Sequence, residues 1–330
     1  MVRQKLLVLL LAFALTACAK KTTLQGTVDK VLRLKERVIL AGDGGDPDRR
    51  TFRTLLENAS FSSNITTLVL LGDNVYPDGI PESEDSEEEQ RFNDQLKQIK
   101  QTKASLLIVP GNHDWGPRDA GLTRLKKQHS AVKGWFGRNI MLPEAGCPGP
   151  AVRDIEESFV LVAIDSEAIL RQERYPEYCA NKTLEEVAHA IEQIGPKKNI
   201  IFLSHHPLVS FGPNSKLTDH CPMRMSCPRY QEMIRALSAA LSKNPPLLCA
   251  AGHDHTLQII KGDSACRNYI VSGALGELHQ IDDNERLRAS SDRNGFLLLE
   301  KYKRGKIQLS IIDTSADNLE GEAFTAFDLN

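Results

Sequence analysis

Six short apolar runs of β type recur along the chain, and they constrain its fold more than any other feature of the sequence. They occupy residues 37–41, 67–72, 105–110, 159–164, 199–204 and 246–251. Helix-like segments separate them. The clearest, at 183–194, opens with Thr183 and Glu186 in a capping-box pattern and continues with apolar residues at helical spacing; a second spans 229–242. Such alternation is typical of an α/β fold.

Four later apolar runs follow at short intervals with glycine-containing turns, as in an antiparallel sheet. They occupy residues 256–260, 268–273, 295–302 and 306–312. Taken together, the two patterns predict two packed sheets flanked by helices. We see no internal repeat and no second domain boundary, so we expect a single domain over residues 36–330.

The composition is that of an ordinary soluble globular protein, with 41% hydrophobic and 25% charged residues. The formal net charge of −2 gives no indication of a nucleic-acid partner. The acids are concentrated in residues 81–90, which hold six of them. This segment predicts a solvated loop or the acidic start of a helix.

Residues 1–17 resemble an export signal. Arg3 and Lys5 precede an apolar run at 6–17 that is too short to span a bilayer comfortably. The run ends in Leu-Thr-Ala-Cys, which resembles a bacterial lipobox and predicts lipidation of Cys18. The alternative is a plain secretory signal that happens to precede a cysteine.

The polar residues 18–35 would then tether the lipid to the domain. A lipid anchor implies export to the bacterial envelope. Ala19 is not the acidic residue associated with inner-membrane retention, so we expect the outer membrane, with the protein facing the periplasm.

Six cysteines remain once Cys18 is assigned to lipid, and an even number in an exported chain permits up to three disulfides. They are Cys147, Cys179, Cys221, Cys227, Cys249 and Cys266. None has the spacing of a zinc site. Cys249 lies in an apolar run and could equally be a buried thiol.

Five of the apolar runs end in polar residues of metal-ligand type. These are Asp43, then Asp73 with Tyr76, Asn112 with His113, His205 with His206, and His253 with His255. Functional groups gather at the carboxyl ends of strands in α/β sheets, so these side chains can converge on one crevice. The series predicts a metal centre.

The five clusters read AGDGG, LGDNVY, PGNHD, SHHP and AGHDH. In this order they resemble the motifs of the calcineurin-like metallophosphoesterase superfamily, and most closely its purple acid phosphatase branch, which includes the tartrate-resistant type. The resemblance spans roughly residues 36–315. It implies a four-layer α/β/β/α sandwich of two mixed sheets flanked by helices.

One departure from the wider superfamily is informative. The superfamily's first motif carries a histidine ligand where this chain has Gly45. In the purple branch the tyrosine of the second motif fills that place, and Tyr76 stands at its position. The loss at one position and the gain at the other explain each other.

The resemblance implies two metal ions bridged by Asp73. The first would be held by Asp43, Asp73, Tyr76 and His255, and the second by Asp73, Asn112, His205 and His253. Two histidines two residues apart in an extended segment point the same way, so His253 and His255 can reach ions about 3.5–4 Å apart.

The ligand charges differ between the two places. Hard anionic oxygens, including a phenolate, suit Fe(III) at the first, whereas an amide oxygen and two neutral imidazoles suit a divalent ion at the second. We therefore expect Fe(III) at the tyrosinate site, paired with Fe(II), Zn(II) or Mn(II).

Such a centre hydrolyses phosphate esters through in-line attack by metal-bound hydroxide. His113 is the family's usual candidate for stabilising the transition state or supplying a proton, although it could instead only orient Asp73 or Asn112. His206 could contact substrate or simply pack beside Pro207. We interpret Asp114 as a partner of the ligands.

The tartrate-resistant relatives carry a further active-site histidine in the loop that corresponds to 208–228, and this chain lacks it at the same spacing. Either His220 or Asn214 could replace it as a substrate-binding residue. The relatives' disulfide in this region would favour a bond between Cys179 and Cys221.

These expectations define a lipid-anchored acid phosphatase that acts on phosphomonoesters, with a phosphorylated small molecule as its partner. A phosphodiesterase or nucleotide pyrophosphatase with the same centre is the alternative. A non-catalytic envelope lipoprotein is a third hypothesis, and retention of all seven ligand positions argues against it.

Overall fold

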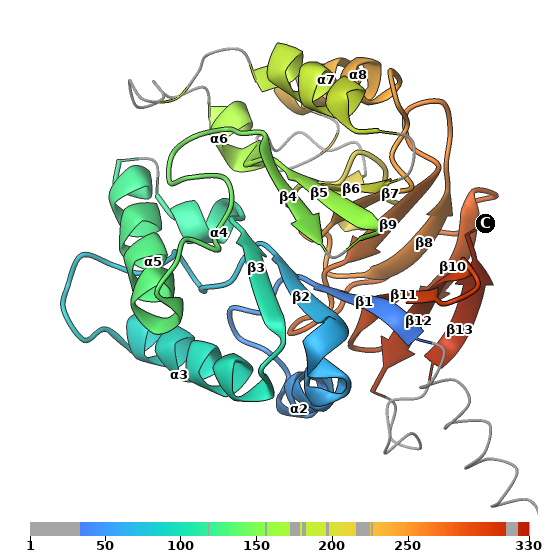
Figure 1. Cartoon of the computed structure of the whole chain (residues 1–330). Coiled ribbons are helices and arrows are strands. Elements are labelled where there is room, and N and C mark those ends of the chain that lie inside the picture. The colour runs from blue at the N-terminus through green and yellow to red at the C-terminus, as the bar shows by residue number, and fades with distance from the viewer. Residues whose placement is uncertain are drawn as a thin grey trace, which may run out of the picture.

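The computed structural model of the chain describes residues 34–117, 119–155, 157–171, 179, 183–195, 198–215, 225, 227–314 and 323–329. The predicted export signal and Cys18 lie outside these residues and stay predictions. The described part forms two sheets that pack face to face, with helices on both outer sides (Figure 1). The predicted four-layer sandwich is confirmed.

The first sheet has the strand order β13-β12-β11-β1-β2-β3. Its strands are β1 Leu34–Ala41, β2 Thr66–Leu71, β3 Ser105–Val109, β11 Gly295–Tyr302, β12 Ile307–Asp313 and β13 Ala323–Asp328. β1, β2 and β3 are parallel, and the other three continue the sheet antiparallel from β1. The carboxyl ends of β1, β2 and β3 therefore lie at the same edge.

The second sheet has the strand order β10-β8-β9-β7-β6-β5-β4. Its strands are β4 Ala151–Ile155, β5 Phe159–Ala163, β6 Asn199–Leu203, β7 Leu248–Ala251, β8 Leu257–Lys261, β9 Asn268–Ser272 and β10 Leu287–Ser291. β5, β6, β7 and β9 form its parallel centre. Antiparallel strands continue it on both sides.

Side chains alternate between the faces of each sheet, as the pleat requires. In β1, Val38 and Leu40 face the second sheet and join the core between the sheets, whereas Ile39 and Ala41 join the core under the helices. All four are fully buried. Burial on both faces explains why these strands appear in the sequence as continuous apolar runs.

Three helices pack on the outer face of each sheet (Figure 1). Those of the first sheet are α2 Arg49–Ser60, α3 Glu87–Thr102 and α5 Gly121–Phe136; those of the second are α6 Ser166–Arg171, α7 Thr183–Gln193 and α8 Pro228–Leu241. The two helices expected from sequence are thus confirmed as α7 and α8. A four-residue helix, α4 Asn112–Trp115, follows β3.

The acidic segment contains both structures that the sequence allowed. Residues 81–86 form turns, and α3 begins at Glu87. The Ser86 hydroxyl accepts a hydrogen bond from the Glu89 amide at 3.2 Å, and three glutamates occupy the first turn. Negative charge at a helix N-terminus is favourable, because the amide dipoles point their positive ends there.

The four later runs do not form one antiparallel sheet. β8 and β9 pair antiparallel in the second sheet, where β9 is also parallel to β7, whereas β11 and β12 pair in the first sheet. Short connections predict which neighbours form hairpins, but the sheet that each hairpin joins depends on long-range contacts.

The expected disulfide between Cys179 and Cys221 is wrong. Cys179 is bonded to Cys147, with Cα atoms 5.3 Å apart, and a cysteine can form only one such bond. Cys147 lies on the segment that leads into β4, and the fold brings this segment to Cys179. Cys227, which precedes α8, is disulfide-bonded too.

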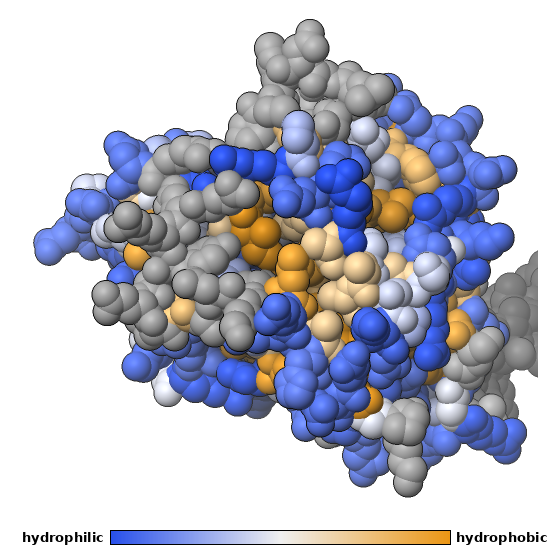
Figure 2. Space-filling model, turned by 90° about the horizontal axis from the view of Figure 1, so that it is seen from above, coloured by the Kyte–Doolittle hydropathy of each residue, from blue (hydrophilic) through white to orange (hydrophobic). Residues whose placement is uncertain are grey.

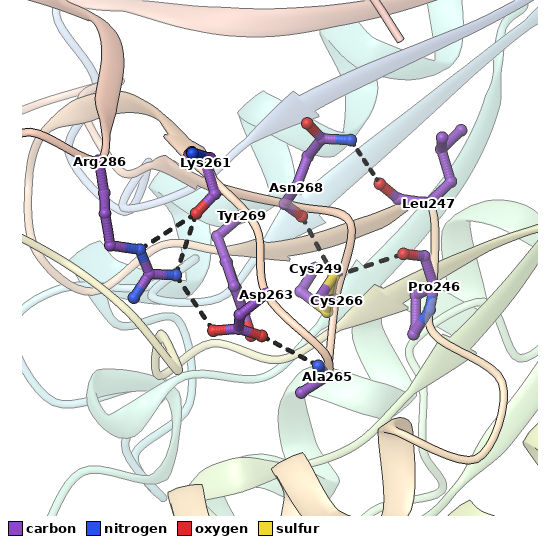
Figure 3. Close-up of a disulfide and its surroundings, with 10 residues drawn as sticks. All are labelled: Pro246, Leu247, Cys249, Lys261, Asp263, Ala265, Cys266, Asn268, Tyr269 and Arg286. Atoms are coloured by element: carbon purple, nitrogen blue, oxygen red, sulfur yellow. Dashed lines mark hydrogen bonds and ion pairs between the residues drawn. A yellow bond between two sulfur atoms is a disulfide. The ribbon is translucent and has the colours of Figure 1, made fainter. Parts of the chain in front are cut away.

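A second disulfide joins Cys249 of β7 to Cys266, just before β9, so Cys249 is not a free thiol (Figure 3). Polar groups surround this bond. The Arg286 guanidinium lies 3.1 Å from the Asp263 carboxylate, which also accepts a hydrogen bond from the Tyr269 hydroxyl at 2.6 Å. The bond and this cluster fasten the turn between β8 and β9 to the sheet.

Hydrophilic residues cover much of the face shown in Figure 2, with a hydrophobic strip in its centre. Within the described residues, the large hydrophobic side chains that stand out as exposed are Phe61, Val152 and Leu184. None of the described helices combines the length and apolar character needed to cross a membrane.

Candidate metal centre

The fold brings the seven predicted ligands together at the carboxyl ends of five strands. Asp43 follows β1, Asp73 and Tyr76 follow β2, Asn112 follows β3, His205 follows β6, and His253 and His255 follow β7. The first three strands belong to one sheet and the last two to the other. The centre therefore lies across the interface of the two sheets.

Four of these residues have left-handed backbone conformations. The φ angles are 59° at Asp43, 53° at Asp73, 69° at His253 and 46° at His255. Non-glycine residues in this region carry strain of about 1–3 kcal/mol each, and such strain is concentrated at functional sites. The turns aim the side chains inward at the expense of stability.

Asp43, Tyr76 and His255 form what we call the first ligand group. The Tyr76 hydroxyl lies 3.2 Å from His255 Nε2 and 3.4 Å from Asp43 Oδ1. His255 Nε2 is also 3.4 Å from Asp43 Oδ1. Three donor atoms of different residues thus face one point.

Asp73, Asn112, His205 and His253 form the second ligand group. The Asn112 amide oxygen lies 3.0 Å from His205 Nε2 and 3.0 Å from His253 Nδ1. Asp73 Oδ2 is 3.3 Å from the same nitrogen of His205. The other nitrogen, Nδ1, donates to the Leu71 carbonyl at 2.8 Å, so Nε2 of the neutral ring is the one free to bind a metal.

These separations fit the predicted dinuclear centre. Nitrogen and oxygen ligands lie about 2.0–2.2 Å from a bound ion such as Zn²⁺, which puts ligands around one ion about 3.0–3.5 Å apart in tetrahedral or octahedral geometry. Donor atoms of Asp43, Asp73 and His205 also lie within 4.8 Å of one another, which links the two groups.

The metal-free charges show how strongly the groups are coupled. Burial opposes charge on both His205 and Asp73, but the charge of each residue favours the charged form of the other. The adjacent carboxylates of Asp73 and Asp43 raise the pKa of His205 to about 10. His205, His113 and His253 hold the pKa of Asp73 below its usual range. A cation bound by His205 would therefore have to displace a proton from this ring.

Gly45 and Tyr76 are in direct contact, which gives the exchange between these positions a steric basis. A Cβ atom at Gly45 would lie 2.5 Å from the Tyr76 amide nitrogen and 2.8 Å from its ring carbon Cδ2. No side chain fits at residue 45 while Tyr76 keeps its place. Burial and the Asp43 carboxylate raise the pKa of the Tyr76 phenol, so the phenol is protonated in the metal-free chain.

Asp114 holds two of the ligand loops together, as a partner of the ligands. Its carboxylate is fully buried and accepts five hydrogen bonds at 2.7–3.1 Å. The donors are the amides of Asn74, Val75 and Gly111 and the side chains of Asn74 and Gln128. Burial and the Asp73 charge raise the pKa of Asp114 to about 6.

His113 lies at the open side of the second ligand group. Its side chain is 34% exposed, and its Nε2 is 3.9 Å from Asp73 Oδ2. Nδ1 hydrogen-bonds to the Pro77 carbonyl, which can only accept, so Nδ1 carries a proton. The predicted role of His113 in catalysis stays a prediction. The amide of His113 also orients Asp73, with a 2.8 Å hydrogen bond to Oδ1.

His206 lies behind the ligands. It is 1% exposed, and its ring centroid is 4.3 Å from that of His253. Its Nδ1 lies 2.9 Å from the Ser166 hydroxyl and its Nε2 lies 3.6 Å from Glu167. This position favours the packing interpretation over substrate contact.

Asn214 also acts on a ligand. Its side-chain amide donates to the His253 carbonyl at 3.1 Å, and its backbone amide donates to Asp254 at 2.8 Å. These bonds hold the turn that carries His253, whereas the predicted substrate contact stays a prediction. His220, the other residue proposed for this role, lies outside the described residues.

Sequence reasoning missed two residues beside the first ligand group, Glu277 and His279. The His279 ring stacks on the His255 ring, with centroids 4.7 Å apart and planes 11° apart. Glu277 lies 3.4 Å from the outer nitrogen of His255. The one feature of the sequence that could have pointed to them is their place shortly after the end of β9, since no motif surrounds them.

Comparison with known proteins agrees with this geometry. The model of the family "Calcineurin-like phosphoesterase" matches residues 37–257. Tartrate-resistant acid phosphatase type 5 of Sus scrofa is 21% identical over 253 residues, which cover 72% of this chain and 69% of that protein.

Two solved structures are similar in fold. GAP50, described as the anchor in the inner membrane complex of Plasmodium, superposes with a TM-score of 0.59 at 17% identity, over 90% of this chain and 89% of that one. Purple acid phosphatase PPD1 from yellow lupin (Lupinus luteus) seeds gives 0.58 at 14% identity, over 89% of this chain and 53% of that one. This chain thus matches about half the length of the lupin enzyme.

Proposed function

Because this chain belongs to the calcineurin-like phosphoesterase family and is a phosphoric ester hydrolase, we propose that it is an acid phosphatase of the purple type that acts on phosphomonoesters. The family implies a dinuclear metal site. We further propose Fe(III) in the first ligand group and Fe(II), Zn(II) or Mn(II) in the second.

The observation that carries the proposal is the place of Tyr76. Its hydroxyl lies 3.2 Å from His255 and 3.4 Å from Asp43, and no side chain fits at position 45 while Tyr76 lies there. Burial and the Asp43 carboxylate raise the pKa of the Tyr76 phenol, so a cation that binds there as a tyrosinate complex has to displace that proton. Among the usual metals, Fe(III) with hard anionic oxygen ligands satisfies that condition.

Two ions bound in these groups would supply charge to neutralise the phosphoryl oxygens and would lower the pKa of a water molecule enough to make it a nucleophile. The chain's own residues do the rest. Asp73 holds the two groups together, and the amide of His113 fixes its orientation. His113 Nε2, on the open side, is placed to donate a proton to the departing alkoxide.

A visible spectrum of the metal-loaded protein, taken together with metal analysis, tests this proposal. We expect two metals per chain and a tyrosinate-to-Fe(III) charge-transfer band that disappears in Tyr76→Phe. Tyr302→Phe is the matched control, because the Tyr302 hydroxyl contacts Glu300 and Gln308 on the first sheet. A fully metallated protein without the band would indicate a manganese- or zinc-type centre instead.

The choice of substrate needs a separate assay. A panel of p-nitrophenyl phosphate, its diester and nucleotides compares the monoesterase with the alternative phosphodiesterase or nucleotide pyrophosphatase. We expect the monoester to be hydrolysed fastest. Equal or faster turnover of diesters would overturn the monoesterase assignment while leaving the metal centre intact.

A non-catalytic envelope lipoprotein is the third hypothesis, and the fold similarity to GAP50, a protein described as an anchor, is the observation that favours it. Retention of both ligand groups supports the enzyme. If the purified chain bound no transition metal and hydrolysed nothing after reconstitution with iron and zinc, the anchor hypothesis would replace it.

The lipid anchor at Cys18 is likewise a proposal, supported by the sequence of residues 1–18. We propose an outer-membrane protein that faces the periplasm. Mass spectrometry of the mature N-terminus should find an acylated Cys18, and Cys18→Ser should release the protein from the membrane fraction. Recovery of a mature chain with unmodified Cys18 would refute it.

A further inference from the structure

Glu277 is held between two imidazole rings at the outer side of the first ligand group. Its Oε2 lies 3.4 Å from His255 Nδ1 and its Oε1 lies 3.2 Å from His279 Nε2. The two rings stack, and the His279 amide donates to the His255 carbonyl at 2.8 Å. The segment after β9 is thereby fastened to the turn that carries His255.

The chemistry of His255 requires an acceptor at this place. Its Nε2 faces Asp43 and Tyr76, so it is the nitrogen that binds the metal. The neutral ring then carries its proton on Nδ1. This atom is buried and makes no regular hydrogen bond within the described part of the chain, and the Glu277 carboxylate is the anionic group that faces it.

A different use of the same three side chains has to be weighed. Donor atoms of His255, Glu277 and His279 lie within 4.8 Å of one another, as in a cation site. However, a proton on Nδ1 prevents this nitrogen from binding a second ion while Nε2 binds the first. Two ligands from an exposed glutamate and a histidine would then remain, which is fewer than a structural metal site uses.

We therefore propose that Glu277 is a positioning residue for the first metal. Its carboxylate accepts a hydrogen bond from the Nδ1–H group of His255, which fixes the tautomer and the orientation of the ring. The same bond makes Nε2 a stronger metal ligand. His279 keeps the carboxylate in place from the other side. The inference rests on the proposed metal centre.

Chelator competition on the metal-loaded protein measures this role directly, with the tyrosinate band as the signal of the first metal. We expect Glu277→Ala to weaken binding of that metal by about 10–100-fold, as removal of a carboxylate behind a ligating histidine does elsewhere. The second metal should be unaffected. The affinity of Glu277→Gln for the first metal should lie between those of the wild type and Glu277→Ala, because its amide oxygen still accepts a hydrogen bond but carries no charge.

Glu285→Gln is the matched control, since it removes the same charge from an exposed residue of the following loop. It should bind metal like the wild type. The thermal stability of metal-free Glu277→Ala should also equal that of the wild type, because Glu277 is 68% exposed. A purely structural role would lower that stability without a specific loss of the first metal.

Three results would overturn the inference. The first is an affinity of Glu277→Ala within twofold of the wild type, while the wild type holds two metals; this leaves the proposed function intact. The second is a wild type that holds three ions per chain and loses one in Glu277→Ala, which would identify a cation site. The third is a wild type that binds no metal, which would overturn the proposed function as well.

Discussion

Gly45→Ala tests whether the absence of a side chain at residue 45 is what allows Tyr76 to reach the first ligand group. The new Cβ would lie 2.5 Å from the Tyr76 amide nitrogen, 2.8 Å from its Cδ2 and 2.9 Å from the Val75 carbonyl carbon. Unstrained contacts of this kind need about 3.5 Å or more. The backbone of residues 75–76 therefore has to move by several tenths of an ångström to about 1 Å.

That movement has two consequences. Overpacking in a tight core costs about 1–3 kcal/mol of unfolding free energy. The Tyr76 hydroxyl also leaves its position 3.2–3.4 Å from His255 and Asp43. A displacement of about 1 Å in a catalytic site can lower the rate about 100-fold, so we expect kcat/KM and first-metal affinity to fall together.

Urea denaturation of the metal-free protein and the tyrosinate band of the loaded protein measure the two effects. Gly134→Ala is the control, because Gly134 lies in α5 and a Cβ there meets nothing within 4 Å. It should raise stability by about 0.5–1 kcal/mol, since alanine favours a helix. Gly45→Ala with wild-type stability and an unchanged band would refute the steric reasoning.

Three further predictions concern stability away from the centre. Burial lowers the pKa of His129 to about 4, below its ordinary 6.5. Between pH 4 and 6.5 the unfolded chain therefore binds more protons than the folded chain. The free energy of unfolding should rise with pH in this range by up to about 1.4 kcal/mol per pH unit. In urea titrations at pH 5 and 7.5, His129→Gln should lose part of that gain, and an equal gain in both proteins would contradict the assignment. Replacing Cys249 and Cys266 together by alanine opens a link between residues 17 apart, which should cost about 3 kcal/mol; a loss below 0.5 kcal/mol would exclude the disulfide's role. The buried Arg37 guanidinium lies 3.5 Å from the Glu300 carboxylate. Glu300→Gln removes this charge partner and should lower the free energy of unfolding by about 3 kcal/mol in the same assay. A neutral effect would show that the pair contributes nothing to stability.

Local patterns were enough to predict much of the fold. The apolar runs became β1, β2, β3, β5, β6 and β7, and the two periodic segments became α7 and α8. β4, β10 and β13 were not predicted from the sequence. β4 and β10 are largely exposed or half-buried, so they lack a continuous apolar run, and they are strands because a neighbouring strand pairs with them.

The order of polar residues at strand ends also led from sequence to site. The fold brings all seven predicted ligands together, because a parallel strand delivers the residue after it to a known edge of the sheet. Their role as metal ligands stays a prediction. The contact between Gly45 and Tyr76 adds a physical reason for the exchange that the sequence implied.

Only the tertiary structure decided which distant groups meet. The bond from Cys147 to Cys179, the burial of His206 behind the ligands and the approach of Glu277 to His255 all join segments whose sequences carry no sign of each other. Secondary structure and strand-end chemistry follow from residues a few positions apart. Contacts between distant segments depend instead on how the two sheets pack, and that is a property of the whole chain.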